Sequence, residues 1–266
     1  MTPSIPDSQL EQFIHDSGWK AENNAGPKAR SIRDKAVGKE VLVFYSGTSI
    51  RVFDTGGFIY HLAFRQRHIN PSLCSHEGRL YDGVGGHIRD TLTDNIVAKR
   101  EGDVIALCSH KGRMYDGGTY SGVFDTLSSR IIVDRKPGTL DLYSDGKQMY
   151  EGRIDGLIAD ILGEEQTIPL TGEVPAICEH EGVLYFSTSE GLSSSIYSYP
   201  EKKESTNVKF MIRSLASYAG DLLFSGTTRF IHNTRSQYPM ARIGDDVHAM
   251  CTHPRKNLVQ EGILPP

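Results

Sequence analysis

The sequence lacks the features that mark a membrane-spanning, exported or nucleic-acid-binding protein. No stretch approaches the run of about 18 apolar residues that a membrane-spanning helix needs. The N-terminus has no basic start followed by an apolar core, so we expect no signal peptide. The 29 Lys and Arg residues against 33 Asp and Glu residues give a net charge of −4, without the basic excess of a nucleic-acid-binding protein. We therefore expect a cytoplasmic protein with neither a membrane nor a nucleic-acid partner.

Several familiar catalytic motifs are absent as well. The chain has no phosphate-binding Walker loop, no nucleophile elbow and no HExxH helix. The glycines at 83, 85 and 86 lie in a predicted hairpin and are not followed by a helix, which argues against a dinucleotide site. We therefore expect no cofactor.

Cysteine is scarce, and the four cysteines share one position of a repeat: Cys74, Cys108, Cys178 and Cys251. Equivalent positions around a common centre point in related directions. Neighbouring cysteines of this kind rarely reach the Cα separation of about 4.4–6.8 Å that a disulfide requires. We predict four reduced thiols, which is typical of a reducing compartment.

The most informative feature is a phrase that recurs along the chain. It reads SLCSHEGRLYDG at 72–83, ALCSHKGRMYDG at 106–117 and AICEHEGVLYFS at 176–187. The aligned positions Tyr81, Tyr115, Tyr150, Tyr185 and Leu223 follow one another at spacings of 34, 35, 35 and 38 residues. A period near 35 indicates one supersecondary unit that is built several times.

Each unit divides into four short runs rich in Val, Ile and Tyr, separated by Gly and Ser, as 104–135 shows. Such runs are typical of strands joined as hairpins. Four antiparallel strands repeated around a ring predict an all-β fold, a β-propeller of short four-stranded blades. A helical solenoid would need a period of 3.6 within each unit, which is absent, and a β-helix has shorter repeats.

The number of blades depends on both ends of the chain. Residues 29–55 read like 212–234, and residues 247–262 form a partial copy, so there are six full units and about half of a seventh. We favour seven blades with a split last blade, and six blades with the tail folded elsewhere is the alternative. Residues 29–266 would form the propeller. Residues 1–28 would form a short helix at 7–19 and a linker, and the helix would cover the incomplete blade or dock onto another chain.

In this pattern of an apolar inner strand, a glycine turn and a third strand ending in Asp-Thr, the chain resembles the WD-repeat and Kelch-like propellers over roughly 29–262. It departs from both families, since no unit has a Trp-Asp dipeptide and the single tryptophan, Trp19, lies outside the repeats. The resemblance implies a rigid binding platform, or less commonly an enzyme with a site on the axis. The Asp-Thr pairs themselves are expected to cap tight turns.

A Cys-x-His pair occurs in four units, and both residue types are good zinc ligands. Two units break the pattern, with Tyr143/Asp145 and Ala216/Tyr218 at the matching places. A metal site that serves every blade would not survive those replacements. We therefore predict no metal. The cysteine is expected to be a small buried filler, and the histidine to bond a neighbouring strand or turn as a latch repeated around the ring.

An acid ends the second strand of three units, at Asp82, Asp116 and Glu151, whereas the places that we match to it in other units hold aromatic residues, among them Tyr45. Carboxylates of three neighbouring blades would stand on one side of the axial mouth, opposite an aromatic half. The alternative is that each acid bonds its own turn.

Two functions follow from this reading. The first is a monomeric, non-enzymatic scaffold that holds a protein, peptide or glycan with its inter-blade loops and axial mouth. Its expected lining residues are Tyr45, His68, Asp82, His87, Asp116, Tyr120, Glu151, Asp155 and Arg229. The alternative is a hydrolase or lyase acting on a sugar or small polar compound, with His87 or His68 as base and Asp116 or Glu151 as partner.

Overall fold

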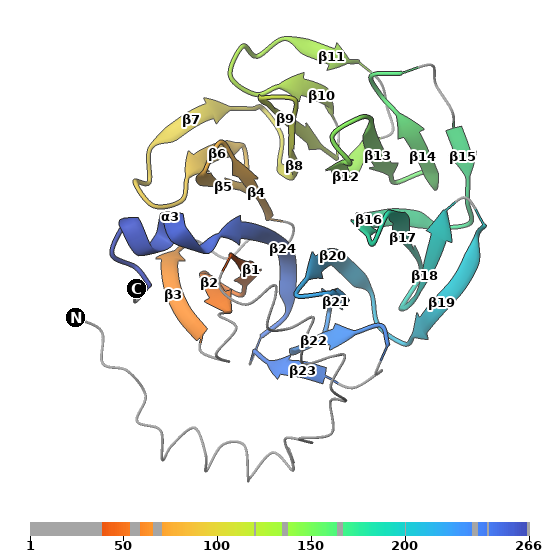
Figure 1. The fold of residues 1–266 in the computed structure, drawn as a ribbon. Helices are drawn as coiled ribbons and strands as arrows, with labels where there is room; N and C mark the ends of the chain where they lie inside the picture. Colours follow the sequence, from red (N-terminus) through yellow and green to blue (C-terminus); the bar gives the residue numbers. More distant parts are fainter. Residues whose placement is uncertain are drawn as a thin grey trace, which may run out of the picture. The chain divides into compact units, whose positions relative to one another are not determined.

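The computed structural model forms a ring of four-stranded antiparallel sheets (Figure 1). It describes residues 39–53, 59–65, 71–119, 121–134, 138–163, 167–199, 201–235, 239–243 and 245–264. The predicted helix at 7–19 and the predicted domain boundary after residue 28 lie outside these residues. The described part of the chain contains one helix, α3 (Arg255–Gln260), which follows the last strand. Nothing in the described residues forms a helix long and apolar enough to cross a membrane.

Six sheets make up the ring, and we number them as blades 1 to 6 in chain order. Blade 1 contains β24 (Val247–Pro254), β1 (Glu40–Ser46), β2 (Ser49–Phe53) and β3 (Ile59–Phe64). Blade 2 contains β4 (Ser72–His76), β5 (Arg79–Val84), β6 (His87–Asp90) and β7 (Ile96–Lys99). Blade 3 contains β8 (Val104–His110), β9 (Arg113–Gly118), β10 (Ser121–Asp125) and β11 (Ile131–Val133).

The other three blades follow the same order. Blade 4 contains β12 (Thr139–Ser144), β13 (Met149–Arg153), β14 (Leu157–Asp160) and β15 (Thr167–Pro169). Blade 5 contains β16 (Glu173–His180), β17 (Val183–Glu190), β18 (Ser193–Tyr199) and β19 (Lys203–Val208). Blade 6 contains β20 (Ile212–Tyr218), β21 (Asp221–Gly226), β22 (Phe230–Asn233) and β23 (Pro239–Arg242).

The preference for seven blades was wrong, and the way the ring closes explains the error. The C-terminal partial copy supplies only β24, the inner strand of blade 1, and β24 pairs along the full length of β1. The incomplete units at the two ends of the sequence therefore combine into one blade. Counting second strands gives six, because β1 is the second strand of blade 1 and the C-terminal copy contributes none. The tail completes a blade in the sheet and does not fold elsewhere.

The hydrophobic core lies between consecutive blades. Each of six apolar clusters joins side chains of two neighbouring sheets, as Cys74, Ile88 and Val104 of blades 2 and 3 illustrate. A single four-stranded sheet would leave these faces in water, so a blade is stable only with neighbours on both sides. The inner strands of all neighbouring blades are in contact around the ring, including β24 with both β4 and β20.

Short turns connect the strands as the sequence predicts. Lys111 and Gly112, between β8 and β9, have φ values of 48° and 72°, the backbone of a two-residue hairpin loop that matches the strand twist. The third strands end as expected, because Asp90, Asp125 and Asn233 accept backbone N–H groups of the residues that follow. Tyr81, Tyr115, Tyr150 and Tyr185 lie on four successive sheets.

Candidate functional site

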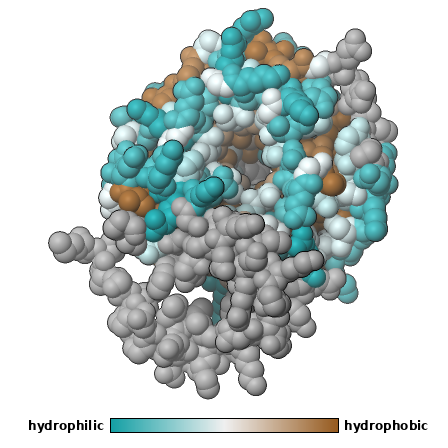
Figure 2. Space-filling view, viewed as in Figure 1, coloured by the Kyte–Doolittle hydropathy of each residue, from teal (hydrophilic) through white to brown (hydrophobic). Residues whose placement is uncertain are grey.

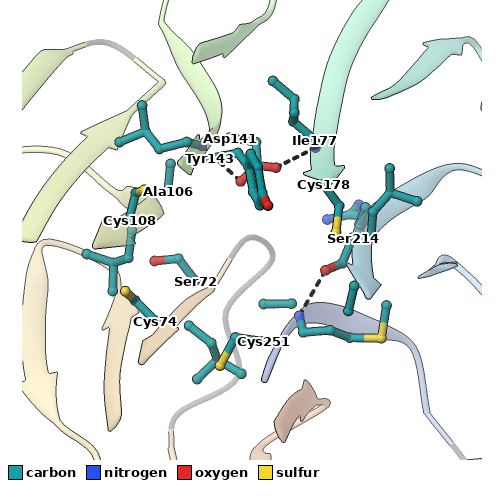
Figure 3. A pocket seen from close by; sticks show the side chains of 18 of the residues that line it. Ser72, Cys74, Ala106, Cys108, Asp141, Tyr143, Ile177, Cys178, Ser214 and Cys251 are labelled. Carbon is teal, nitrogen blue, oxygen red and sulfur yellow. Dashed lines mark hydrogen bonds between the residues drawn. The ribbon is translucent and has the colours of Figure 1, made fainter. Parts of the chain in front are cut away.

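The inner strands enclose a cavity of about 350 Å³ on the ring axis (Figure 3). Residues from the inner strands of all six blades line it. Figure 2 shows the hollow at the centre of the ring from one face. The four cysteines form one layer of its wall, and Tyr143 and Ala216 complete that layer in blades 4 and 6. A cavity on the axis of a rigid ring is the default binding site of this architecture.

Asp141 on β12 stands out in the cavity wall. The matching residues of the other blades are small: Ser72, Ala106, Ala176, Ser214 and Ala249. Its Oδ2 accepts the N–H of Ile177 on the next blade at 2.7 Å, and its Oδ1 accepts the N–H of Leu142 at 2.9 Å. Burial raises the pKa of Asp141 to about 7, although both backbone hydrogen bonds act in the opposite direction. A carboxyl group with such a pKa on a cavity wall is a candidate functional group.

The histidines of the Cys-x-His pairs form the predicted latch between neighbouring inner strands. The Nδ1 atom of each one lies 2.7–2.9 Å from a serine Oγ on the next blade. The pairs are His253 with Ser75, His76 with Ser109, His110 with Ser144, and His180 with Ser217. Burial is the main cause that lowers the pKa of His110, His180 and His253. Low pKa values favour neutral imidazoles in these latches.

Two of the six seams between inner strands have no histidine latch. Asp145 and Glu179 stand at the latch positions of blades 4 and 5, and Tyr218 and Thr252 at those of blades 6 and 1. At these two seams, the residue at the strand position of Asp141 makes a hydrogen bond to the inner strand of the next blade. Asp141 accepts the N–H of Ile177, and Ser214 Oγ accepts the N–H of Met250 at 2.9 Å.

The four thiols are free, as predicted. Burial raises the pKa of Cys74 and of Cys178 to about 12 and raises the pKa of Cys108 and Cys251 as well. Such thiols are weak nucleophiles, since the thiolate is the reactive form. Within the described ranges, no group of three or more His, Cys, Asp or Glu side chains is arranged to hold a metal ion.

The three acids at the ends of second strands lie between blades, not at the mouth. Asp82 is 0% exposed, Asp116 1% and Glu151 1%. The Arg65 guanidinium that follows β3 binds both oxygens of Asp82 at 2.9 and 3.0 Å, and Arg100 that follows β7 binds both oxygens of Asp116 at 2.7 Å. The described hydrogen bonds of Asp82 and Asp116 go to Arg65, Thr91 and Arg100, outside the turns that follow their own strands. Asp82 and Asp116 are each held by the arginine that follows the last strand of the preceding blade, and Glu151 accepts a hydrogen bond from Thr139 of its own blade. A buried carboxylate requires such a charged or hydrogen-bonding partner.

In the other half of the ring, the positions that match these acids and arginines hold apolar residues. Phe186, Phe224 and Phe44 take the place of the acids, and Leu170, Phe210 and Ile243 take the place of the arginines. Phe210 stacks on Phe224 with ring centroids 6.2 Å apart. The strand register corrects one assignment: Phe44 pairs with Met250 and matches Asp82, whereas Tyr45 is one position further along.

The remaining predicted binding residues separate into three groups. Tyr45 is fully buried in the core between blades 1 and 2, where burial raises its pKa to about 12. Asp155 and Arg229 lie on the loops between second and third strands of blades 4 and 6, and His87 begins the third strand of blade 2 directly after the matching loop. All three therefore lie at one end of the ring. Asp155 and Arg229 are exposed, and His87 is half-buried. His68 and Tyr120 lie outside the described residues.

Sequence reasoning missed Asp141 and the two arginine latches, although the repeat contains a signal for each. Asp141 is the one acid in a column of alanine and serine. Arg65, Arg100 and Arg135 recur at spacings of 35 residues, in step with the acids that follow each of them. The described residues include Arg65 and Arg100 but not Arg135.

Comparisons with known proteins place the architecture but not a family. No protein-family model and no curated protein matches the sequence. The structure is similar to a chain of a nidogen–laminin complex, with a TM-score of 0.61, 8% identity, and coverage of 81% of this chain and 99% of that chain. It is also similar to a chain of a mitotic checkpoint complex, with a TM-score of 0.52, 13% identity, and coverage of 81% and 83%. The WD40 β-propeller domain of Doa1 is a weaker match, with a TM-score of 0.47, 10% identity, and coverage of 66% and 69%. With six four-stranded blades closed by the C-terminal strand, the chain has a β-propeller architecture.

Proposed function

We propose that the chain is a non-enzymatic scaffold that holds a protein partner at one end of the ring. That end carries the loops between second and third strands, where exposed Asp155 and Arg229 and half-buried His87 project from a ring held by hydrogen bonds at every inner seam. Loops that rigid strands hold in place suit recognition, because little conformational entropy is lost on binding. This placement of charged loops on a locked ring is the observation that carries the proposal.

A shallow groove at the same end adds to the candidate surface. Asp155 lines it together with Glu173 and Glu190, at the boundary between blades 4 and 5. Arg153 donates a 2.7 Å hydrogen bond to Asp155 and is itself buried, which fixes the direction of the Asp155 carboxylate. The charged side chains that line this groove are acidic, and the exposed Arg229 at the same end of the ring adds a positive charge. Polar and charged side chains of this kind are typical of the rims of protein interfaces.

The hydrolase or lyase alternative finds less support in the geometry. It requires Asp116 or Glu151 to reach a substrate, and both side chains are almost fully buried. Asp116 is bound by Arg100, and the Glu151 Oε1 atom accepts a 2.6 Å hydrogen bond from Thr139. General acid–base work needs a carboxyl group within hydrogen-bond reach of the substrate.

The scaffold is tested by affinity capture from a lysate of the source cells, followed by mass spectrometry. The baits are the wild type, the triple variant His87→Ala/Asp155→Ala/Arg229→Ala, and a matched triple variant at the opposite end. The matched residues are Arg130, Lys147 and Glu201, which are exposed on turns between first and second or third and fourth strands. We expect the wild type and the matched variant to retain the same proteins and the first variant to lose them. Equal retention by all three baits would contradict the proposed surface, and binding only to a glycan array would replace the protein partner with a glycan.

A further inference from the structure

We propose that the axial cavity takes an organic cation, a protonated amine or a guanidinium group, with Asp141 as its counter-ion. The inference rests on the proposed binding function and names the chemistry that the cavity would recognise. The cation could be a lysine or arginine side chain of the partner or a free small molecule. Three observations support it: Asp141 lies in the cavity wall, it has no cationic partner among the described residues, and the matching residues of the other blades are uncharged.

Asp141 lies where a ligand in the cavity would meet it. Figure 3 shows Asp141 and Tyr143 projecting from β12 into the space that the inner strands enclose. Each carboxylate oxygen of Asp141 accepts one backbone N–H. An ionised carboxylate has about four acceptor sites, so half of the capacity of Asp141 remains for a ligand.

The two most deeply buried aspartates of the described chain have a cationic partner. Asp82 and Asp116, at the ends of β5 and β9, each receive two hydrogen bonds from one arginine, Arg65 or Arg100. Among the residues that the structure describes, no basic side chain forms an ion pair with Asp141. Within the described residues, only backbone N–H groups bind the carboxylate of Asp141, so a cation would gain most at this carboxylate.

Other charged and titratable groups of the cavity wall do not supply that cation. They are Cys74, Cys108, Tyr143, Cys178, Glu179, Arg213, His248 and Cys251. The only permanent cation of this set is Arg213, and the carboxylates that act on its pKa are Asp246 and Glu173. The thiols and the Tyr143 hydroxyl are neutral near neutral pH because burial raises their pKa values.

A purely structural role for Asp141 is the competing explanation, since Asp141 also joins blades 4 and 5. The repeat provides the control. Ser214 occupies the same column and makes the matching bond to the N–H of Met250 with a neutral hydroxyl. A serine is therefore sufficient for the bond between blades, and the additional feature at position 141 is the negative charge. Asp141→Ser removes that charge and can keep the bond, whereas Ser214→Ala removes a bond and leaves the charge.

The test is a titration of the full chain with ethylguanidinium and with its neutral isostere ethylurea, in an amine-free buffer near pH 8, where Asp141 is mostly ionised. Binding is followed through the amide resonances of Ile177 and Leu142, the two donors to Asp141. A second arm uses capped tripeptides with a central arginine or a central citrulline. We expect wild type and Ser214→Ala to bind the cation at least about tenfold more tightly than the neutral isostere. We expect Asp141→Ser to bind the two alike, and Asp141→Asn serves if the serine variant does not fold.

The outcomes separate clearly. Selective binding of the peptide cation assigns the site to a partner side chain, and binding of ethylguanidinium alone assigns it to a free small cation. Equal affinity of wild type for ethylguanidinium and ethylurea, or unchanged selectivity in Asp141→Ser, would overturn the inference. Capture of partners by the loop surface uses variants that leave the cavity intact, so the proposed function can survive that failure.

Discussion

At the scale of single residues, equivalent positions of the six blades share a backbone environment but not a chemistry. The inner layer of the cavity holds a cysteine in four blades, where a small apolar side chain fills the space, and Tyr143 or Ala216 in the other two. Two positions earlier in each strand, alanine and serine give way once, to Asp141. An acid at this position is informative because alanine or serine satisfies the fold at the matching position of every other blade.

The buried thiols give a direct test of the cavity layer. We expect the folded chain to show almost no reaction with a disulfide reagent near pH 8 within minutes, because burial raises the pKa of all four thiols and so keeps the reactive thiolate scarce. In denaturant all four cysteines should react at once. Rapid titration of two or more thiols in the folded chain would show that these thiols are more acidic than the structure indicates.

Asp141 should make stability depend on pH. Its pKa is about 7 in the folded chain, above the value of about 3.9 expected for an unfolded aspartate. Below about pH 4 the carboxyl group is neutral in both states, and between about pH 4 and pH 7 only the unfolded chain releases the proton. The contribution of Asp141 to stability is therefore present at acid pH and is lost as the pH rises through that window.

The expected result is a difference between wild type and Asp141→Ser that changes with pH. Relative to the serine variant, wild type should be more stable at pH 5 than at pH 8 by about 1–2 kcal/mol in urea unfolding. The lowered pKa values of His110, His180 and His253 act in the opposite direction, but these three histidines are present in both proteins and cancel in the difference. A difference that stays constant from pH 5 to pH 8 would mean that Asp141 is not shifted.

At the scale of elements, two sets of equivalent contacts fasten neighbouring blades in the described part of the chain. One joins inner strands through His–Ser pairs or through Asp141 and Ser214. The other joins the end of an outer strand to the second strand of the next blade, through Arg65–Asp82, Arg100–Asp116 or an apolar pair such as Phe210–Phe224. An Arg–Asp ion pair and a pair of apolar side chains can therefore occupy the same position between blades of this fold.

This interchange predicts a strong coupling at the ionic seams. Asp116→Phe alone should destabilise the chain by about 3–5 kcal/mol, because it leaves the Arg100 guanidinium buried without its partner. Arg100→Leu alone should have a similar cost. The double variant has the same residue pair as Leu170 and Phe186 between blades 4 and 5, and it should recover most of the lost free energy of unfolding. Urea unfolding of wild type, the two single variants and the double variant measures the coupling energy between the two positions. Additive effects of the two changes would contradict the direct interaction of Arg100 with Asp116.

The sequence predicts the elements well because its repeat, its glycine turns and its Asp-Thr endings are all local signals. The histidine latch could also be predicted, since two units that lose the histidine exclude a shared metal site. The position of Asp82 and Asp116 could not be read from one unit, because their partners Arg65 and Arg100 belong to the preceding blade. The alignment of Tyr45 failed for a related reason: only pairing with β24, which comes from the other end of the chain, fixes the register of β1.

At the scale of the whole molecule, closure of the ring depends on one strand. β24 pairs with β1 at seven positions from Glu40 to Ser46 and contacts the inner strands of blades 2 and 6. Its Met250 and Val247 pack with Phe44 in the core between blades 6 and 1, and its His253 forms the latch to Ser75. Without β24 the two ends of the blade series have no shared sheet, and two apolar faces meet water.

A chain cut after Asp246 should therefore fail to form the closed ring. We expect it to bind a hydrophobic dye and to lose the single cooperative urea transition of the full chain, because the apolar side chains of blades 1 and 6 are uncovered. A synthetic peptide of residues 247–264, added in excess, should restore the transition by pairing with β1. The same peptide carrying Met250→Asp should restore much less, since Met250 is buried against Phe44. If the shortened chain unfolds as steeply and at the same urea concentration as the full chain, β24 does not close the ring.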